Sequence, residues 1–181
     1  MHAQTAAVLG RWQPVHTGHQ AVLQSLCEKY TSVMVGIGSS NIDDYRSPFA
    51  LADVEAMLQL ALAGYDNYTL IPVPDLPDDG AWTRRAIDLI GRPDIFFTAN
   101  PYVLSLFAGR LPLAHPVEAV PRERRTPVTG TQVRRELARG DGWIPLVPVR
   151  VADYLRRNGL DERFRASYGL HTLVMETIVI D

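Results

Sequence analysis

The sequence contains a single cysteine, Cys27, among 181 residues, so no disulfide can form within the chain. No apolar run approaches the roughly 20 residues of a transmembrane helix. The N-terminus lacks the basic and then apolar pattern of a secretory signal peptide. These absences disfavour an extracellular or membrane-spanning protein, and we expect a soluble cytoplasmic one.

The sequence also lacks a large excess of positive or negative charge, because the formal net charge is only −2. The sequence therefore gives no electrostatic reason to expect nucleic acid or an anionic membrane as a partner. Three isolated histidines (His2, His115 and His171) have no cysteine, histidine or aspartate at zinc-site spacing, and no protein metal site is predicted. The length suits one sizeable core, so we expect one domain over residues 1–168 and a tail over 169–181.

The most informative segment is GRWQPVHTGH, from Gly10 to His19. It follows an apolar run at 6–9 that is typical of a buried strand, and it precedes a helical pattern at 22–30. A glycine-containing loop between a first strand and a first helix is where α/β proteins bind phosphates, since backbone N–H groups and the helix dipole point there. Arg11, His16 and His19 add cationic and hydrogen-bonding groups suited to a polyphosphate.

Strand and helix patterns alternate through most of the chain. This alternation predicts a Rossmann-like, doubly wound parallel sheet of the α/β class, followed by C-terminal helices. The predicted strands are 6–9, 32–37, 68–73, 94–98 and 117–120, and the predicted helices are 22–30, 50–63, 81–90, 102–108 and 129–139.

A second candidate phosphate site opens the helix predicted at 129–139. Thr129 and Thr131 can cap this helix or donate hydroxyl hydrogen bonds to an anion, and Arg134 lies about one turn further on. Taken alone, the segment is better explained as a capped helix with a solvated arginine. Its pairing with the first loop gives it weight.

In this order the two motifs, HxGH and then [ST]-x-[ST]-x-x-R, resemble those of the nucleotidylyltransferases. Several further stretches are similar to the archaeal-type nicotinamide mononucleotide (NMN) adenylyltransferases: IGSSN, RSPF, IPVPD with Trp82 seven residues after Asp75, FTANPYV and TGTQVRREL. The resemblance implies transfer of AMP from ATP to NMN, giving NAD and pyrophosphate, with Mg²⁺ assisting.

The resemblance also implies roles for individual residues. The catalytic groups would be His16, His19, Arg11 and Arg134. ATP would be bound by these four residues together with Gly10, Gly18, Asn100, Thr129 and Thr131. The acceptor side would be formed by Ser39, Arg46, Asp75, Asp79 and Trp82. Trp82 is explained equally well as core packing or as a stacking platform for a pyridinium ring.

Three features depart from the family pattern. Asp79 replaces the usual asparagine, the helix after Phe49 lacks a common arginine, and a tail extends from about Leu170. Because residues 172–180 are apolar and β-prone, we expect the tail to form an extra strand, either in its own sheet or in that of a partner in a homo-oligomer. A weaker similarity links the tail to the start of the Nudix hydrolase domain fused to some bacterial relatives.

Other functions remain open from the sequence. The acceptor could be nicotinate mononucleotide, phosphopantetheine or flavin mononucleotide, because enzymes for these substrates share the same two motifs. A non-catalytic nucleotide sensor on the same fold is a different class of answer, disfavoured by the intact His16, His19 and Arg134.

Overall fold

Five short strands form one parallel sheet in this computed structural model, which describes residues 4–177. The strand order is β3-β2-β1-β4-β5, and every neighbouring pair runs parallel. The order reverses at β1, which lies between β2 and β4. This confirms the predicted Rossmann-like α/β class. The strands are β1 (Thr5–Gly10), β2 (Ser32–Gly38), β3 (Tyr68–Val73), β4 (Ile95–Phe97) and β5 (Leu113–Ala114).

The chain forms two compact units. The first contains the whole sheet and comprises the described residues up to Arg11, then Ala21–Ile42 and Gly64–Arg125. The second comprises Trp12–Gln20, Asp43–Ala63 and the chain from Thr126 on. The long helix α1 (Thr17–Lys29) contributes residues to both units.

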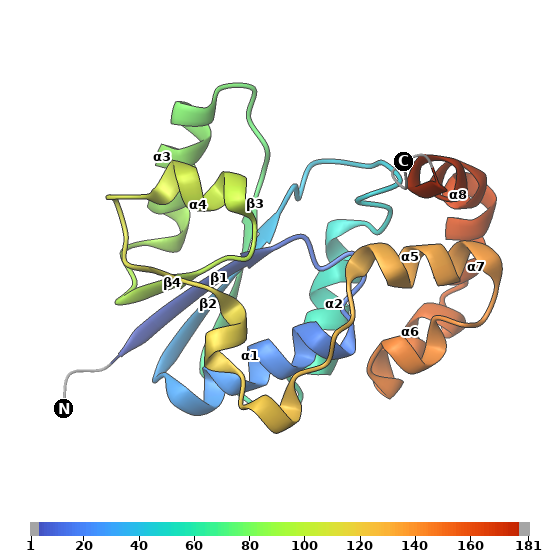
Figure 1. The fold of residues 1–181 in the computed structure, drawn as a ribbon, viewed down its shortest axis with the longest axis horizontal. Helices are drawn as coiled ribbons and strands as arrows, with labels where there is room; N and C mark the ends of the chain where they lie inside the picture. Colours follow the sequence, from blue (N-terminus) through green and yellow to red (C-terminus); the bar gives the residue numbers. More distant parts are fainter. Residues whose placement is uncertain (1–3, 178–181) are drawn as a thin grey trace. The chain divides into compact units, whose positions relative to one another are not determined.

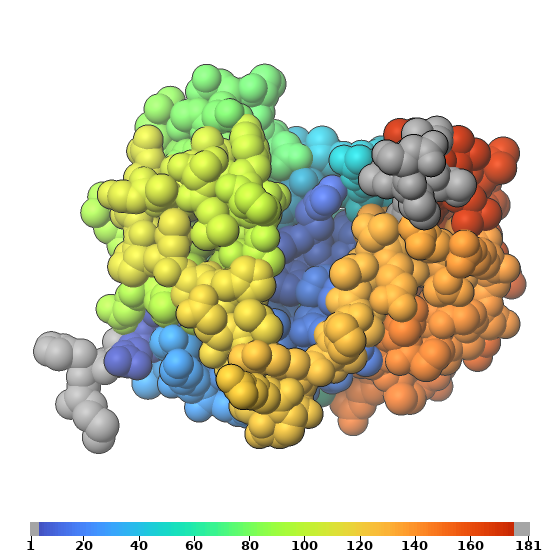
Figure 2. All heavy atoms as spheres, in the orientation of Figure 1, coloured from blue at the N-terminus to red at the C-terminus, as the bar shows by residue number. Residues whose placement is uncertain are grey.

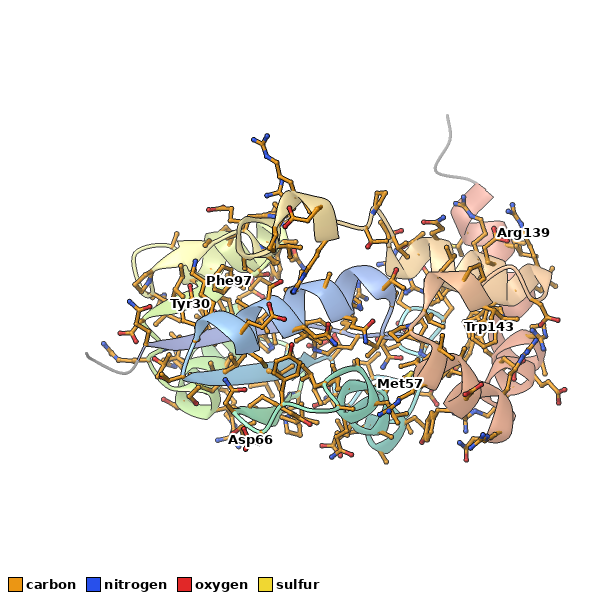
Figure 3. All side chains as sticks on the ribbon, turned by 90° about the horizontal axis from the view of Figure 1, so that it is seen from below. Tyr30, Met57, Asp66, Phe97, Arg139 and Trp143 are labelled. Atoms are coloured by element: carbon orange, nitrogen blue, oxygen red, sulfur yellow. The ribbon has the colours of Figure 1, made fainter. Side chains whose placement is uncertain are left out.

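The sheet of the first unit is covered on both faces, as the alternation of side chains along β4 shows. Phe96 stacks on Phe107 of α4 (Pro101–Phe107), with ring centres 4.7 Å apart. The next residue, Phe97, points the other way and meets Tyr30 edge-on at 6.1 Å, directly after α1 (Figure 3). In Figure 1, α3 (Asp79–Ile90) and α4 lie together over one face of the sheet.

The second unit is helical. In Figure 2 its part from Thr126 on gives the surface coloured orange to red. Trp143, labelled in Figure 3, is the largest of its fully buried side chains. Its elements are the start of α1, α2 (Leu51–Ala61), α5 (Gly130–Arg139), α6 (Val149–Arg157), α7 (Leu160–Phe164), a π-helical turn (Arg165–Gly169) and α8 (Leu170–Thr177).

Two predicted strands are wrong. The segment predicted as a strand at 117–120 lies mostly in a 3-10 helix, Pro116–Ala119, and the fifth strand is Leu113–Ala114 instead. The tail forms helix α8 from Leu170, and its last four residues lie outside the described part of the chain. Because α7, the π-helical turn and α8 follow one another directly, the helical segment also runs across the boundary expected at residue 168.

Among the described residues, no helix combines the length and apolar character needed to cross a bilayer.

Candidate active site

The loop that carries the first motif is tightly packed in the second unit. Trp12 is 3% exposed and has a φ of 57°, in the left-handed region that costs a non-glycine residue energy. Its ring meets the ring of His19 edge-on, with 4.8 Å between ring centres. Trp12 thus adopts a strained backbone conformation in which its aromatic ring is buried against the motif residue His19.

His16 and His19 contact each other by ring stacking and by two hydrogen bonds. Their rings stack with centres 3.5 Å apart and planes 19° apart. The backbone N–H of His19 donates to Nδ1 of His16 at 3.2 Å, and the backbone N–H of His16 donates to Nδ1 of His19 at 3.4 Å. A nitrogen that accepts a hydrogen bond carries no proton, so the neutral rings have their proton on Nε2.

Both histidines are disposed to be neutral in the protein alone. Burial lowers the pKa of His16 to about 4, and the positive charge of Arg134 acts in the same direction. Burial also lowers the pKa of His19 well below its usual value, and His16 adds to this effect, while a hydrogen bond with the Pro14 backbone opposes it. The pair therefore carries ring N–H groups rather than charges, that of His19 in a hydrogen bond with the Pro14 backbone, and it would gain charge only beside an anion that raises these pKa values.

Glycine is required between the histidines. A Cβ atom at Gly18 would lie 3.1 Å from the Thr126 carbonyl oxygen and 3.2 Å from the His16 ring. Both distances are tighter than ordinary contacts, and one partner is backbone that cannot move cheaply. The HxGH spacing thus lets the first turn of α1 approach the chain that leads to α5.

Helix α5 brings the second motif to the same loop. The Thr129 hydroxyl caps it by accepting from the Gln132 N–H at 3.1 Å. Arg134 is only 7% exposed, so the alternative of a solvated arginine is wrong. Its Nη1 donates to the Gln13 carbonyl at 2.8 Å, and its Nη2 lies 3.4 Å from the Thr131 hydroxyl. A Cβ atom at Gly130 would come within 3.2 Å of the same guanidinium.

Gln13 is a site residue that the sequence analysis did not single out. Its buried side chain pairs with the backbone of Phe49: Nε2 donates to the Phe49 carbonyl and Oε1 accepts the Phe49 N–H, both at 3.0 Å. Its own carbonyl accepts from Arg134. One residue therefore joins the HxGH loop, the end of the segment that carries Arg46, and α5. Its position inside GRWQPVHTGH was the only signal in the sequence.

Arg46 lies in a turn of the second unit. The Asp44 carboxylate accepts the backbone N–H groups of Arg46 at 2.8 Å and Ser47 at 2.7 Å, which fixes the turn. The Arg46 side chain is exposed, and its Nε donates to the Tyr45 hydroxyl at 2.8 Å. This contact leaves the two terminal nitrogens of the guanidinium for other partners.

In the first unit, Gly10 is the last residue of β1, Arg11 follows it directly, and Asn100 lies three residues after β4. These strands pair in register with Val8 opposite Phe97, so the chain leaves both strands at the point where the strand order reverses. Ligands of open parallel sheets bind at this switch point. Arg11 is exposed, and the Asn100 side chain caps α4 by accepting the Tyr102 N–H at 3.0 Å.

The acceptor-side residues of the first unit lie on loops beyond β2 and β3. Ser39 has a φ of 54° directly after β2. Two residues later, the Asn41 side chain binds the Asp75 backbone in both directions, at 2.8 Å and 3.2 Å. Asp79 is the first residue of α3, and its carboxylate accepts a short hydrogen bond from the Tyr102 hydroxyl. Asp79 and Asp75 are both exposed.

Trp82 packs into the core of the first unit. Its ring meets Phe107 edge-on at 5.8 Å and contacts the buried cluster under α3 and α4. Core packing is therefore part of its role, whereas stacking on a ligand ring stays a prediction. Within the described chain its buried indole N–H finds no hydrogen-bond partner, which leaves one donor for a ligand oxygen.

The described residues contain no group of three or more histidine, cysteine or acidic side chains that could hold a metal ion.

Comparisons with known proteins agree with this geometry. A family model described as "Cytidylyltransferase-like" matches residues 7–136. A nicotinamide-nucleotide adenylyltransferase from Thermococcus kodakarensis is 32% identical over 153 residues, 82% of this chain and 80% of the relative. The enzyme of the same name from Pyrococcus horikoshii is 33% identical over 161 residues, 87% of this chain and 85% of the relative.

A solved structure shares the fold. It is a bifunctional NMN adenylyltransferase/ADP ribose pyrophosphatase from Francisella tularensis, complexed with AMP and a manganese ion. Its TM-score is 0.73 at 16% identity, and the match covers 96% of this chain and 54% of that chain. This chain thus spans about half of the solved protein. Motifs, fold and relatives agree, and the chain belongs to the cytidylyltransferase-like family, among the nicotinamide-nucleotide adenylyltransferases.

Proposed function

We propose that this protein transfers AMP from ATP to NMN, giving NAD and pyrophosphate. The observation that carries the proposal is the arrangement of the buried His16 and Arg134 with the half-buried His19, three donors fixed by the backbone of one loop and the start of α5. Donors held in advance of the reaction are what a triphosphate with shifting charge requires.

The reaction needs no nucleophile from the protein. The phosphate of NMN attacks the α-phosphorus of ATP in line; a P–O bond forms there as the bond to the β-phosphate bridging oxygen breaks, and pyrophosphate leaves. The protein has to align two anions that repel each other and to stabilise the charge that develops on pyrophosphate.

In this proposal the second unit binds the triphosphate. The N–H groups of His16 and His19 donate to phosphate oxygens, and Arg134 supplies positive charge. The free N–H groups at the start of α5 and the hydroxyls of Thr129 and Thr131 add neutral donors for the β- and γ-phosphates. Gly10, Arg11, Gly18 and Asn100 are the other residues that we propose to contact ATP.

The acceptor would be recognised by a cation, two carboxylates and an indole. Arg46 binds the phosphate of NMN, because its terminal nitrogens match a phosphate oxygen pair. Asp75 and Asp79 accept hydrogen bonds from the carboxamide or ribose. Trp82 offers its indole N–H to an oxygen of the acceptor, with Ser39 at the turn beside the same loops.

We propose Mg²⁺ as the ion that accompanies ATP, bound to the phosphates, and we assign it no side-chain ligands in this chain. When bound, it would neutralise charge on the leaving pyrophosphate. We also propose that the reaction takes place in the cytoplasm.

The test is pyrophosphate release by the purified protein with MgATP and, one at a time, NMN, nicotinate mononucleotide, phosphopantetheine and flavin mononucleotide, with product masses measured. We expect NAD as the main product, and His19→Ala as a matched inactive control. Release with another acceptor alone would reassign the substrate. ATP binding without release under any acceptor would favour the nucleotide sensor.

A further inference from the structure

One face of the C-terminal helical segment is occupied by the turn that carries Arg46. Phe164, Tyr168 and His171 are spaced i, i+4 and i+7, which places them along one side of the helical segment from α7 through the π-helical turn into α8. All three make contacts with residues of the segment 43–49, and all of these residues belong to the second unit.

The contacts are of three kinds. Phe164 packs on Phe49 with ring centres 6.3 Å apart. The Tyr168 hydroxyl donates to the Asp43 carboxylate at 2.7 Å. The His171 ring stacks on the Tyr45 ring, with 4.4 Å between centres and an angle of 18° between planes.

Tyr45, which stacks on His171, also contacts Arg46. The Arg46 Nε donates to the Tyr45 hydroxyl at 2.8 Å, and the guanidinium carbon lies 5.3 Å from the centre of the Tyr45 ring. The order of contacts is therefore His171, Tyr45 and Arg46. An exposed arginine has many rotamers, and fixing its Nε on a tyrosine that is itself stacked removes most of them.

Nothing in the ordinary packing of a helix end requires this arrangement. Phe164 and Phe49 are buried, but His171, Arg46 and Asp43 are exposed, so the contacts of Tyr168 and His171 add little buried apolar area to that of the Phe164–Phe49 pair. A polar turn fixed at several points by exposed side chains gains little stability but a defined geometry.

We propose that Tyr168 and His171 are positioning residues for the acceptor: they hold the 43–47 turn so that Arg46 points its terminal nitrogens at the phosphate of the incoming mononucleotide. This inference rests on the proposed function. It gives the tail from Leu170 a role in substrate recognition, carried by a helix rather than by the expected strand.

The test distinguishes an effect of the His171–Tyr45 ring stacking from a general loss of stability. His171→Ala removes the ring, whereas His171→Phe keeps an aromatic ring that can stack on Tyr45. We expect His171→Ala to raise the KM for NMN roughly five- to tenfold, the range that one aromatic pair can supply, while kcat and the KM for ATP change less than about twofold. His171→Phe should restore the KM, and Tyr168→Phe should raise it roughly threefold.

A matched control lies in the same unit. The Tyr154 hydroxyl donates to the Asp53 carboxylate at 3.0 Å, a bond like that of Tyr168 to Asp43 but away from the 43–47 turn. Tyr154→Phe should leave the KM for NMN unchanged. An equal rise in Tyr154→Phe would make the effect one of general stability and overturn the proposal.

Amide hydrogen exchange of the unliganded protein supplies a readout that does not depend on activity. Exchange at residues 43–47 should quicken in His171→Ala and return to the wild-type rate in His171→Phe. Unchanged exchange would overturn the proposal even if the enzyme makes NAD. Faster exchange with an unchanged KM for NMN would also overturn it, because the turn would then be held without serving the acceptor. A wild-type protein that makes no NAD would instead refute the proposed function.

Discussion

His16 and Arg134, assigned to the triphosphate, differ from Asp75 and Asp79, assigned to the acceptor, in how far their side chains are buried. His16 and Arg134 are 5% and 7% exposed, and each is fixed by backbone groups of the same loop. Asp75 and Asp79 are exposed at the starts of loops and helices. A rigid group serves chemistry common to every turnover, while exposed loops can change with the substrate.

The largest expected effect tests whether the buried histidines, unlike the exposed aspartates, act in catalysis. His19→Ala should lower kcat about 100-fold or more, the scale measured for one preorganised donor, with little change in the KM for NMN. His16→Ala should act in the same direction. Asp75→Ala, from the exposed group, should instead change mainly the KM for NMN. Steady-state kinetics with both substrates varied decides; turnover near wild type in both histidine variants would remove this loop from catalysis.

Arg134→Lys sharpens the comparison by keeping the charge. Lysine cannot contact the Gln13 carbonyl, the Thr131 hydroxyl and a phosphate pair at once, so we expect kcat/KM for ATP to fall roughly 30-fold. The loss should appear with ATP varied and not with NMN varied. Arg135→Lys, one residue on, serves as the control. An unchanged ATP dependence would mean that Arg134 has a purely structural role.

The buried histidines also predict how stability depends on pH. Burial lowers the pKa of His16 to about 4 in the folded protein, below its unfolded value, so the unfolded chain binds the proton more readily. The contribution is complete above about pH 6.5 and is lost as the pH falls toward 4. Between pH 7 and pH 5 the free energy of unfolding should drop by about 2 kcal/mol from this group.

Urea unfolding at several pH values measures this drop. His16→Gln should flatten the pH dependence over that range. A His16→Gln variant with the slope of the wild type would show that His16 titrates normally.

The smallest effect concerns the exposed group. If Asp79 faces the acceptor ring, its charge accepts from a carboxamide and repels a carboxylate, which favours NMN over nicotinate mononucleotide at least about tenfold in kcat/KM, or roughly 1.4 kcal/mol. Asp79→Asn should narrow the gap. Tyr102→Phe, which removes the hydroxyl that binds Asp79, is the companion variant. Equal use of both acceptors by the wild type would place Asp79 outside the acceptor site.

The positions of the two motifs could be predicted from the sequence, because the strand and helix patterns of the adjacent residues indicate them. HxGH lies between an apolar run and a helical pattern, and the threonines at 129 and 131 begin a helix. The role of Gln13 could not be found in this way. Its importance comes from its two partners, the Phe49 backbone and the Arg134 side chain, which lie 36 and 121 residues further along the chain.

The two strand errors have local causes. The apolar residues at 117 and 120 suggested a strand, but Pro116 begins a 3-10 helix that His115 and Glu118 close with reciprocal caps. In the tail, apolar and β-branched residues suggested a strand, whereas helix α8 begins at Leu170 and its residue His171 stacks on Tyr45. In the tail, tertiary contacts therefore outweighed the strand propensity of the residues.

The bond between Arg134 and the Gln13 carbonyl joins residues 121 positions apart. Contacts of such long sequence separation form late, since the chain between them must be ordered before they bring any gain. During synthesis, a nascent chain that has emerged only through residue 125 would carry the histidines but not α5. The triphosphate site would thus be assembled as one of the last events of folding.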